Sequence, residues 1–518
     1  MPIRVPVCYD PLTFSGDTMR HPRSSGLLLH PTSLPGPFGI GDIGPMAHSF
    51  VDFLAMAGQS LWQVLPLGPT SFGDSPYQCL SSFAGNPNLI SPEALAEAGL
   101  VTAEELAAYP RFDDGRIRFG PAIEAKQALL REVHRHWEGR ASQTLKDRFS
   151  RFVRGHAQAG WLEDFALFMA LKAAHQGAPW PQWPAAIRDR DAGALDDARR
   201  RLAHDIGYHL LCQFLFREQW DALRQRAALD GIKLVGDIPI FVAYDSADVW
   251  RDRSLFQLDD QGRPKAVAGV PPDYFSRTGQ LWGNPLYDWQ AVADDDYQWW
   301  ARRLGHALSL CDILRLDHFR GFEAYWAVPA GAPTAESGAW EPGPGQAFLD
   351  AMRRHLGHLP LIAEDLGVIT PPVAALRDDN ELPGMRILQF AWDGKATNDF
   401  LPHRHDPRSV VYTGTHDNAT TRGWWQGASK EERARVAAYL GKPVDDPAWA
   451  LIELGMRSPA DQVIIPLQDL LSLGDEGRMN LPGAAEGNWG WRLGQPGLSE
   501  AIARRLGDLT RTYGRWPA

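Results

Sequence analysis

Cysteine is scarce in this sequence, and long apolar runs are absent. The chain has 518 residues, and its cysteines stand far apart, at Cys8, Cys79, Cys212 and Cys311. This scatter argues against a disulfide scaffold and a CxxC-type zinc site. No run of about 18 apolar residues occurs, and the first residues, MPIRVPVCYDPLTFSG, lack the apolar core of a secretory leader. We therefore expect a cytoplasmic protein that does not span a membrane.

Basic residues are also fewer than acidic residues. The sequence carries 52 Lys and Arg against 63 Asp and Glu, a formal net charge of -11. This balance argues against nucleic acid and anionic membranes as partners, because both are polyanions. The phosphate-binding pattern GxxxxGK[ST], the zinc pattern HExxH and the hydrolase pattern GxSxG are missing as well. We therefore expect a neutral substrate, or a charged one that contacts only a local group of residues of opposite charge.

One pattern points to a dinucleotide cofactor, but its context argues against one. Residues 39–44, GIGDIG, match the GxGxxG pattern, yet prolines at positions 31, 35 and 37 separate them from the preceding apolar run. The next apolar run, LWQVL, ends without the acid that would bind a ribose. We therefore predict no cofactor, and a cofactor-dependent barrel is a poor alternative.

What the sequence does contain is a series of short apolar runs bounded by turn residues, typical of buried parallel strands. Helical patterns lie between most of them, for example over residues 45–57. Strand and helix alternating eight times predict an α/β fold, the (β/α)8 TIM barrel. The predicted strands are 26–30, 61–65, 232–237, 312–317, 361–364, 385–390, 410–413 and 462–467.

The interval between the second and third predicted strands is too long for a single crossover. It is rich in helical patterns, such as residues 161–174. We predict that residues 88–230 form a mostly helical subdomain inserted into the barrel. The barrel itself is then formed by residues 1–87 and 231–518, with further insertions in its loops.

Four acids fall at or just beyond the ends of predicted strands, where a barrel gathers its functional side chains at one mouth. A helix cap is the alternative interpretation for each of them. The helix after Glu364 has its own N-cap candidate in Thr370, and the next helical pattern after Asp317 begins only near residue 346, so neither acid is needed as a cap. For Asp417 the capping alternative stays open. The four acids are Asp237, Asp317, Glu364 and Asp417.

Two of these acids suggest a matched catalytic pair. Arg315 precedes Asp317 by two residues, so on a strand both side chains leave the same face, and the guanidinium favours an ionised, nucleophilic carboxylate. Glu364 needs the opposite tuning, a raised pKa, to act as an acid. Such a pair performs retaining glycoside chemistry. His318 and His416, each beside an acid, are expected to hydrogen-bond sugar hydroxyls or the carboxylates; a structural histidine is the alternative.

Aromatic residues occur in an unusual place. Many of the 20 tryptophans lie in stretches rich in glycine and proline rather than in periodic runs, among them Trp282, Trp340 and Trp489. Aromatic rings in loops often line a binding surface, and a pyranose ring offers them its apolar C–H faces.

Several segments together resemble the amylomaltase or 4-α-glucanotransferase family of the α-amylase superfamily, in the family's order and over nearly the whole chain. They are HPTSLPGPFGIGDIG (30–44), SPYQCLSSFAGNPNLIS (75–91), GDIPIFVAYDSADVW (236–250), GVPPDYFSRTGQLWGNPLYDW (269–289), LRLDHFRGF (314–322), AEDLG (363–367), YTGTHDN (412–418), NLPG (480–483) and GNWGWR (487–492).

This resemblance implies transfer of α-1,4-glucan segments from a maltodextrin donor to the 4-hydroxyl of glucose or a malto-oligosaccharide, with retention and without a metal. It implies that Asp317 is the nucleophile, Glu364 the acid/base and Asp417 a third carboxylate that grips sugar hydroxyls. It also implies an aromatic lid at Tyr274 and Phe275. The predicted substrate-binding residues are Ser75, Tyr77, Asp237, Tyr274, Phe275, Trp282, Arg315, His318, Asp393, His416 and Asn480.

Two rival functions use the same fold. A hydrolytic α-glucanase would carry the same carboxylates and differ only in whether water or a sugar completes the second step. A catalytically silent glucan-binding protein would be expected to lack at least one of Asp317, Glu364 and Asp417, and all three are present.

Overall fold

The computed structural model describes residues 23–112, 115–157, 160–272, 276–484, 486–494 and 497–517. Within them, eight parallel strands close into a barrel in the order β1-β12-β11-β10-β9-β6-β3-β2. Each predicted strand overlaps one of these, so the predicted (β/α)8 barrel is confirmed. The strands are β1 (Ser24–Leu28), β2 (Leu61–Gln63), β3 (Lys233–Pro239), β6 (Ile313–Asp317), β9 (Leu361–Ala363), β10 (Gly384–Ile387), β11 (Ser409–Tyr412) and β12 (Gln462–Pro466).

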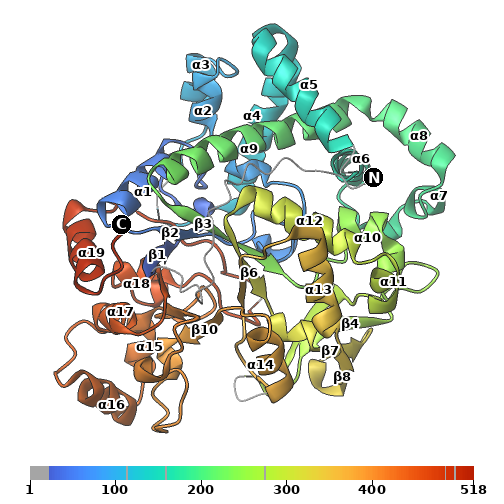
Figure 1. The fold of residues 1–518 in the computed structure, drawn as a ribbon. Coiled ribbons are helices and arrows are strands. Elements are labelled where there is room, and N and C mark those ends of the chain that lie inside the picture. The colour runs from blue at the N-terminus through green and yellow to red at the C-terminus, as the bar shows by residue number, and fades with distance from the viewer. Residues whose placement is uncertain are drawn as a thin grey trace.

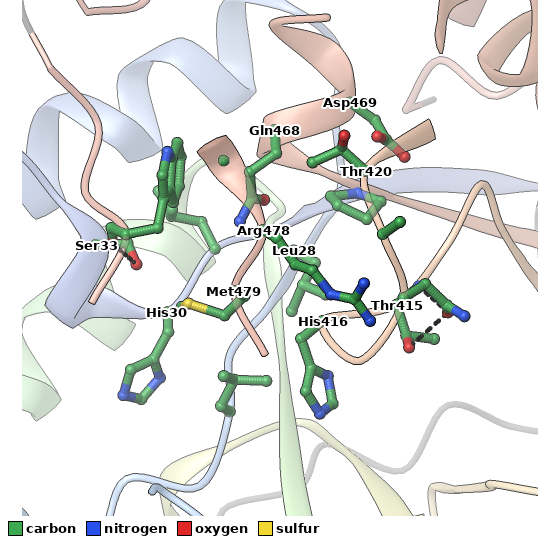
Figure 2. Close-up of a pocket in the computed structure, with 17 residues that line it drawn as sticks. Leu28, His30, Ser33, Thr415, His416, Thr420, Gln468, Asp469, Arg478 and Met479 are labelled. Carbon is green, nitrogen blue, oxygen red and sulfur yellow. Dashed lines mark hydrogen bonds between the residues drawn. The ribbon is translucent and has the colours of Figure 1, made fainter. Parts of the chain in front are cut away.

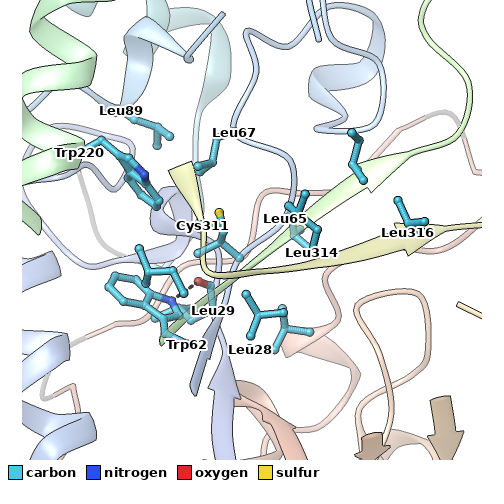
Figure 3. Packing of buried hydrophobic residues seen from close by; sticks show 14 of the residues in the cluster. Leu28, Leu29, Trp62, Leu65, Leu67, Leu89, Trp220, Cys311, Leu314 and Leu316 are labelled. Carbon is cyan, nitrogen blue, oxygen red and sulfur yellow. Dashed lines mark hydrogen bonds between the residues drawn. The ribbon is translucent and has the colours of Figure 1, made fainter. Parts of the chain in front are cut away.

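The barrel strands read as continuous apolar runs because both of their faces are buried. Leucines of β1 and β6, such as Leu28, Leu314 and Leu316, lie in one hydrophobic cluster (Figure 3). The indole nitrogen of Trp62, on β2, donates to the carbonyl of Leu29 at 2.8 Å, which satisfies its only polar atom inside the core. The barrel closes where β1 pairs with β12, with Gly26 opposite Ile464.

Helices surround the strands, as Figure 1 shows. The first, α1 (Pro45–Met56), occupies the segment where the sequence predicts a helix. The capping box of Ser429 and Glu432 is present at the start of α16. The remaining helices outside the β2–β3 interval are α10 (Ala247–Arg251), α11 (Trp289–Asp294), α12 (Gln298–Leu310), α13 (Gly345–Leu356), α14 (Pro371–Asp378), α15 (Thr421–Gly427), α16 (Lys430–Leu440), α17 (Pro447–Arg457), α18 (Leu467–Leu470) and α19 (Glu500–Thr512).

The interval between β2 and β3 is helical, as predicted. The long helix α9 packs against α4, α5 and α6 and returns the chain to β3. Lys126, on α4, is fully buried; its ammonium donates to the carbonyl of Ile90 and lies 3.7 Å from the Asp42 carboxylate. The helices are α2 (Pro92–Glu97), α3 (Ala103–Ala108), α4 (Phe119–Arg140), α5 (Gln143–Ala157), α6 (Leu162–Ala174), α7 (Ala185–Arg188), α8 (Ala192–Arg201) and α9 (Ala203–Leu229). The boundaries drawn at residues 88 and 230 stay a prediction.

A small antiparallel sheet, which was not predicted from the sequence, takes up part of the interval between Asp317 and the helix near residue 346. Two of its strands, β7 and β8, lie in that interval. β8, AWEP, is short and ends in proline, whereas β7, AYWAVP, is an apolar run that is not among the predicted strands. The strand order is β5 (Gln280–Pro285), β4 (Ala266–Val270), β7 (Ala324–Pro329) and β8 (Ala339–Pro342).

No helix in the described ranges has both the length and the apolar character required to cross a bilayer.

Candidate active site

An arginine joins two acids at the ends of β3 and β6. Asp237 and Arg315 are register partners on these neighbouring strands. One terminal nitrogen of Arg315 donates to both carboxylate oxygens of Asp237, at 2.9 and 2.7 Å, and the other lies 2.8 Å from Asp317. Burial raises the pKa of the Asp237 carboxyl, and the guanidinium opposes that shift. The expected proximity of Arg315 and Asp317 is therefore found, and Asp237 completes a buried bridge.

Tyr77 covers the Asp237 side of this bridge. Its hydroxyl donates to Asp237 at 2.7 Å, while its ring stacks on His416 with centroids 5.2 Å apart. Burial raises the pKa of Tyr77 well above its usual value, and the Asp237 charge adds to this, so the phenol stays a donor. Ser75 supports the same turn, because its hydroxyl accepts the backbone amide of Tyr77 at 3.2 Å.

Glu364 follows directly after β9, beside the end of β6. The register pairs Leu316 with Ala363, which places Asp317 and Glu364 at the ends of adjacent strands. The carboxylate oxygens of Glu364 accept the amides of His318 and Leu366, at 2.7 and 2.9 Å. Burial raises the pKa of Glu364 to about 8, with a further contribution from the Asp317 charge, although Arg315 and the two amides act in the opposite direction. Glu364 is therefore protonated near neutral pH.

His318 holds a strained position next to this carboxyl. Its backbone is left-handed, with φ 55° and ψ 49°, a conformation that is costly for a residue with a side chain and often marks a functional site. Its ring meets Trp282 edge to face, with centroids 4.8 Å apart. Burial lowers the pKa of His318 to about 3, so the ring is neutral. Among the described residues its Nε2 atom is buried and has no hydrogen-bond partner, which is unusual for a buried polar atom.

Asp417 lies in a separate group of polar residues after β11. Its carboxylate accepts the side-chain amide of Asn480 at 2.6 Å and lies 3.3 Å from Nε2 of His416. The backbone amide of Asn480 also donates to the His416 carbonyl. Helix α15 is capped by Thr420, whose side chain accepts the amide of Gly423, so the capping alternative for Asp417 is wrong.

Arg478 supports the loop that carries His416 and Asp417, and a pocket lies beside this loop. Arg478 donates to the backbone carbonyl of Asp417 at 2.9 Å. A small pocket of about 20 Å³ is lined by residues of this loop, and the side chains of His30 and His416 point to the same side of it (Figure 2). Burial lowers the pKa of His30 to about 3. No sequence pattern marks Arg478 individually, and His30 is marked only by its place at the start of HPTSLPG.

Asp393 is the predicted substrate-binding residue that lies apart from these groups in the described part of the chain. Asp393 lies on an exposed loop, where its carboxylate accepts the amide of Lys395 at 3.0 Å. Tyr274 and Phe275, the predicted lid, lie outside the described residues. Thr370 occupies the N-cap position of α14, but its side chain makes no capping hydrogen bond; a proline follows at the first helical position instead.

A closed parallel barrel with buried, ion-paired carboxyl groups at the C-terminal ends of its strands is the arrangement of a (β/α)8-barrel enzyme. The family model described as 4-alpha-glucanotransferase matches residues 29–496. The chain therefore belongs to the 4-alpha-glucanotransferase family and is a transglycosylating enzyme, which confirms the resemblance found in the sequence.

Individual relatives agree with this assignment. The 4-alpha-glucanotransferase of Thermus thermophilus is 50% identical over 496 residues, covering 94% of this chain and 98% of the relative. That of Synechocystis sp. is 48% identical over 497 residues, covering 95% and 98%. The solved amylomaltase from Streptococcus agalactiae in complex with acarbose superimposes with a TM-score of 0.92 at 36% identity, covering 96% of this chain and 100% of that one.

Proposed function

We propose that this 4-α-glucanotransferase moves α-1,4-glucan segments from a maltodextrin donor to glucose or a malto-oligosaccharide by a retaining double displacement. One observation carries the mechanism: Asp317 and Glu364 end neighbouring strands in opposite environments. Asp317 is ion-paired with Arg315, whereas Glu364 is buried with a pKa of about 8. Adjacent strands lie about 4.8 Å apart. This spacing is compatible with the carboxyl separation of about 5–5.5 Å in retaining enzymes.

In the first step, an oxygen of Asp317 attacks the anomeric carbon of the donor while Glu364 gives its proton to the departing glycosidic oxygen. A covalent glucosyl ester on Asp317 results, and the reducing-end fragment leaves. In the second step, the Glu364 carboxylate removes the proton from the acceptor 4-hydroxyl. That oxygen attacks the anomeric carbon, and Asp317 is released.

The surrounding residues are proposed to hold the donor sugar. Asp417, fixed by Asn480, accepts sugar hydroxyls, and His318 offers its unpartnered ring nitrogen. Burial lowers the pKa of His416, so its ring acts as a neutral hydrogen-bonding group. Asp237 and Arg315 support the nucleophile, and Tyr77 orients Asp237.

Five further residues complete the proposal. Trp282 offers an aromatic wall next to His318. Tyr274 and Phe275 are proposed to close over the cleft and exclude water, which favours transfer over hydrolysis. Ser75 and Asp393 are proposed to contact the glucan further from the bond that is cleaved.

The proposed substrate class also draws on a relative. The Streptococcus agalactiae amylomaltase was solved with acarbose, and we propose that the corresponding mouth of this barrel binds α-glucan chains. We still predict that the protein acts without a metal, a cofactor, nucleic acid or a membrane. Its cytoplasmic location is also a prediction.

A product ladder tests the transfer. The purified protein is incubated with maltotriose alone, and products are separated by chromatography while total reducing ends are measured. Glucose together with longer maltodextrins, at constant reducing ends, is the expected result, and Asp317→Asn should abolish it. Rising reducing ends without longer products would identify a hydrolase and contradict the proposal.

A further inference from the structure

Trp340 is an exposed aromatic residue that the mechanism does not use. It lies on β8, the last strand of the antiparallel sheet, directly opposite Trp326 on β7. Its exposed fraction is 40%, large for an indole. The two strands lie together at the lower right of Figure 1. Among the exposed large hydrophobic residues of the described chain, it is the one tryptophan.

Two neighbours hold the ring of Trp340 in one orientation. The Arg320 guanidinium stacks on it, 3.8 Å from the ring centroid. Trp326 meets it edge to face, with centroids 5.2 Å apart. Arg320 is itself buried and donates to the carbonyl of Val368 at 2.6 Å. The indole is therefore preorganised, and little rotamer entropy remains to be lost when a ligand covers it.

Arg320 and its partner Val368 lie in the same two loops whose backbone amides bind Glu364. His318 and Leu366 donate their amides to the Glu364 carboxylate. Two residues beyond His318 lies Arg320, under Trp340, and two residues beyond Leu366 lies Val368, which is 56% exposed. Trp340 and Val368 are thus connected through Arg320, next to the two loops that hold the Glu364 carboxyl.

We propose that Trp340 and Val368 form an accessory binding surface for the distal glucose units of an α-1,4-glucan, outside the group of carboxylates. The inference rests on the proposed function, because Glu364 would handle the oxygen that joins the donor segment to the leaving or acceptor fragment. A fragment of several units extends past the Glu364 loops, and its pyranose C–H faces can stack on the indole. Glucose alone is too short to reach both contacts.

The chain offers a matched control. Trp516 is also stacked by an arginine, Arg511, at the same 3.8 Å. Its ring lies against Gly58, in the turn between α1 and β2, which is the end of the barrel away from the mouth. Trp516→Ala therefore removes an equivalent cation–π pair at a place where no glucan is expected.

The experiment compares glucose and maltohexaose as acceptors at a fixed donor concentration. For Trp340→Ala, the ratio of kcat/KM for maltohexaose to that for glucose is expected to fall about three- to tenfold, through KM, as for loss of one aromatic contact. Trp340→Phe should restore most of the ratio, and Trp516→Ala should leave it unchanged. An equal loss for both acceptors, or no loss, would overturn the inference.

A binding measurement distinguishes a failure of this inference from a failure of the proposed function. In the Asp317→Asn background, titration calorimetry with maltohexaose measures affinity without turnover, and adding Trp340→Ala should weaken it by a similar factor. Failure of the maltotriose ladder would refute the function whatever this titration gives, whereas unchanged affinity would refute only the Trp340 surface. If Trp340→Ala instead dissociates an oligomer in light scattering, the surface is a contact between copies and the inference is wrong.

Discussion

Asp469 binds Thr421 twice, accepting its backbone amide at 2.6 Å on one oxygen and its hydroxyl at 2.7 Å on the other. The second oxygen also accepts the hydroxyl of Thr413. Thr413 and Thr421 bracket the loop that carries His416 and Asp417. A single buried carboxylate therefore fixes both ends of that loop.

Asp469→Ala is expected to destabilise the protein by about 2–4 kcal/mol, because three buried donors lose their acceptor. It should also raise the KM for maltotriose, since the Asp417 loop is no longer held. Urea unfolding and steady-state kinetics measure the two effects. Asp469→Asn keeps an acceptor oxygen and should be milder in both; equal kinetics for all three proteins would refute the positioning role.

The pH dependence should report the buried Glu364 carboxyl. With a pKa of about 8, it is protonated below that pH and can act as an acid, so kcat/KM should decline as pH rises through about 8. A pH profile from pH 5 to 10 checks this. An alkaline limb near 5, the range of an ordinary glutamate, would contradict the assignment.

The free energy of unfolding should also depend on the protonation of Glu364, and its raised pKa determines the direction of that pH dependence. Glu364 has a pKa of about 8 in the folded protein, well above the 4.5 of an ordinary glutamate, so the folded state binds more protons between these limits. The free energy of unfolding should therefore fall as pH rises from about 4.5 to about 8. Glu364→Gln should flatten this part of the curve, which urea unfolding at pH 5 and pH 8.5 would detect.

Arg315 should resist even conservative replacement. Arg315→Met leaves the buried Asp237 without its cation and is expected to cost about 3–5 kcal/mol of stability. Arg315→Lys keeps the charge but not the planar fork that reaches both Asp237 and Asp317, so kcat should fall roughly 100-fold with a smaller stability loss. Thermal unfolding and kcat distinguish the cases, and near-normal turnover of Arg315→Lys would contradict the bridging role.

Lys126→Met should loosen the inserted helices. Burial raises the pKa of Asp42 to about 6, and Lys126 opposes the shift. Without the ammonium that pKa rises further, so the loss of stability, about 2–4 kcal/mol, should be larger at pH 8 than at pH 5. Adding Asp42→Asn should recover part of it; a pH-independent loss would show that packing alone is responsible.

The barrel could be predicted because its strands are buried on both faces and so appear as uninterrupted apolar runs. The helical insertion followed from its length and periodicity. The antiparallel sheet escaped prediction because β8, AWEP, has only four residues and depends on its pairing with β7. β7, AYWAVP, is a six-residue apolar run that could have been predicted as a strand.

The sequence likewise predicts some residues of the candidate site and not others. Asp317 and Glu364 could be located because one ends a strand and the other directly follows one, whereas Asp237, placed at the end of its predicted strand, lies two residues before the end of β3. The sequence left a cap as an alternative for Asp417, and only the hydrogen bond at Thr420 removes it. Asp469 gave no signal, since its role depends on reaching the hydroxyl of Thr413, 56 residues away.

The pairing of β1 with β12 has a consequence for biosynthesis. Because the ribosome makes β12 last among the barrel strands, β1 keeps an unpaired edge until about residue 466 has emerged. At a typical rate of about 5–20 residues per second, that edge is exposed for tens of seconds, which favours pairing with other nascent chains. Soluble yield should therefore depend on chaperone supply more than on the final stability of the closed barrel.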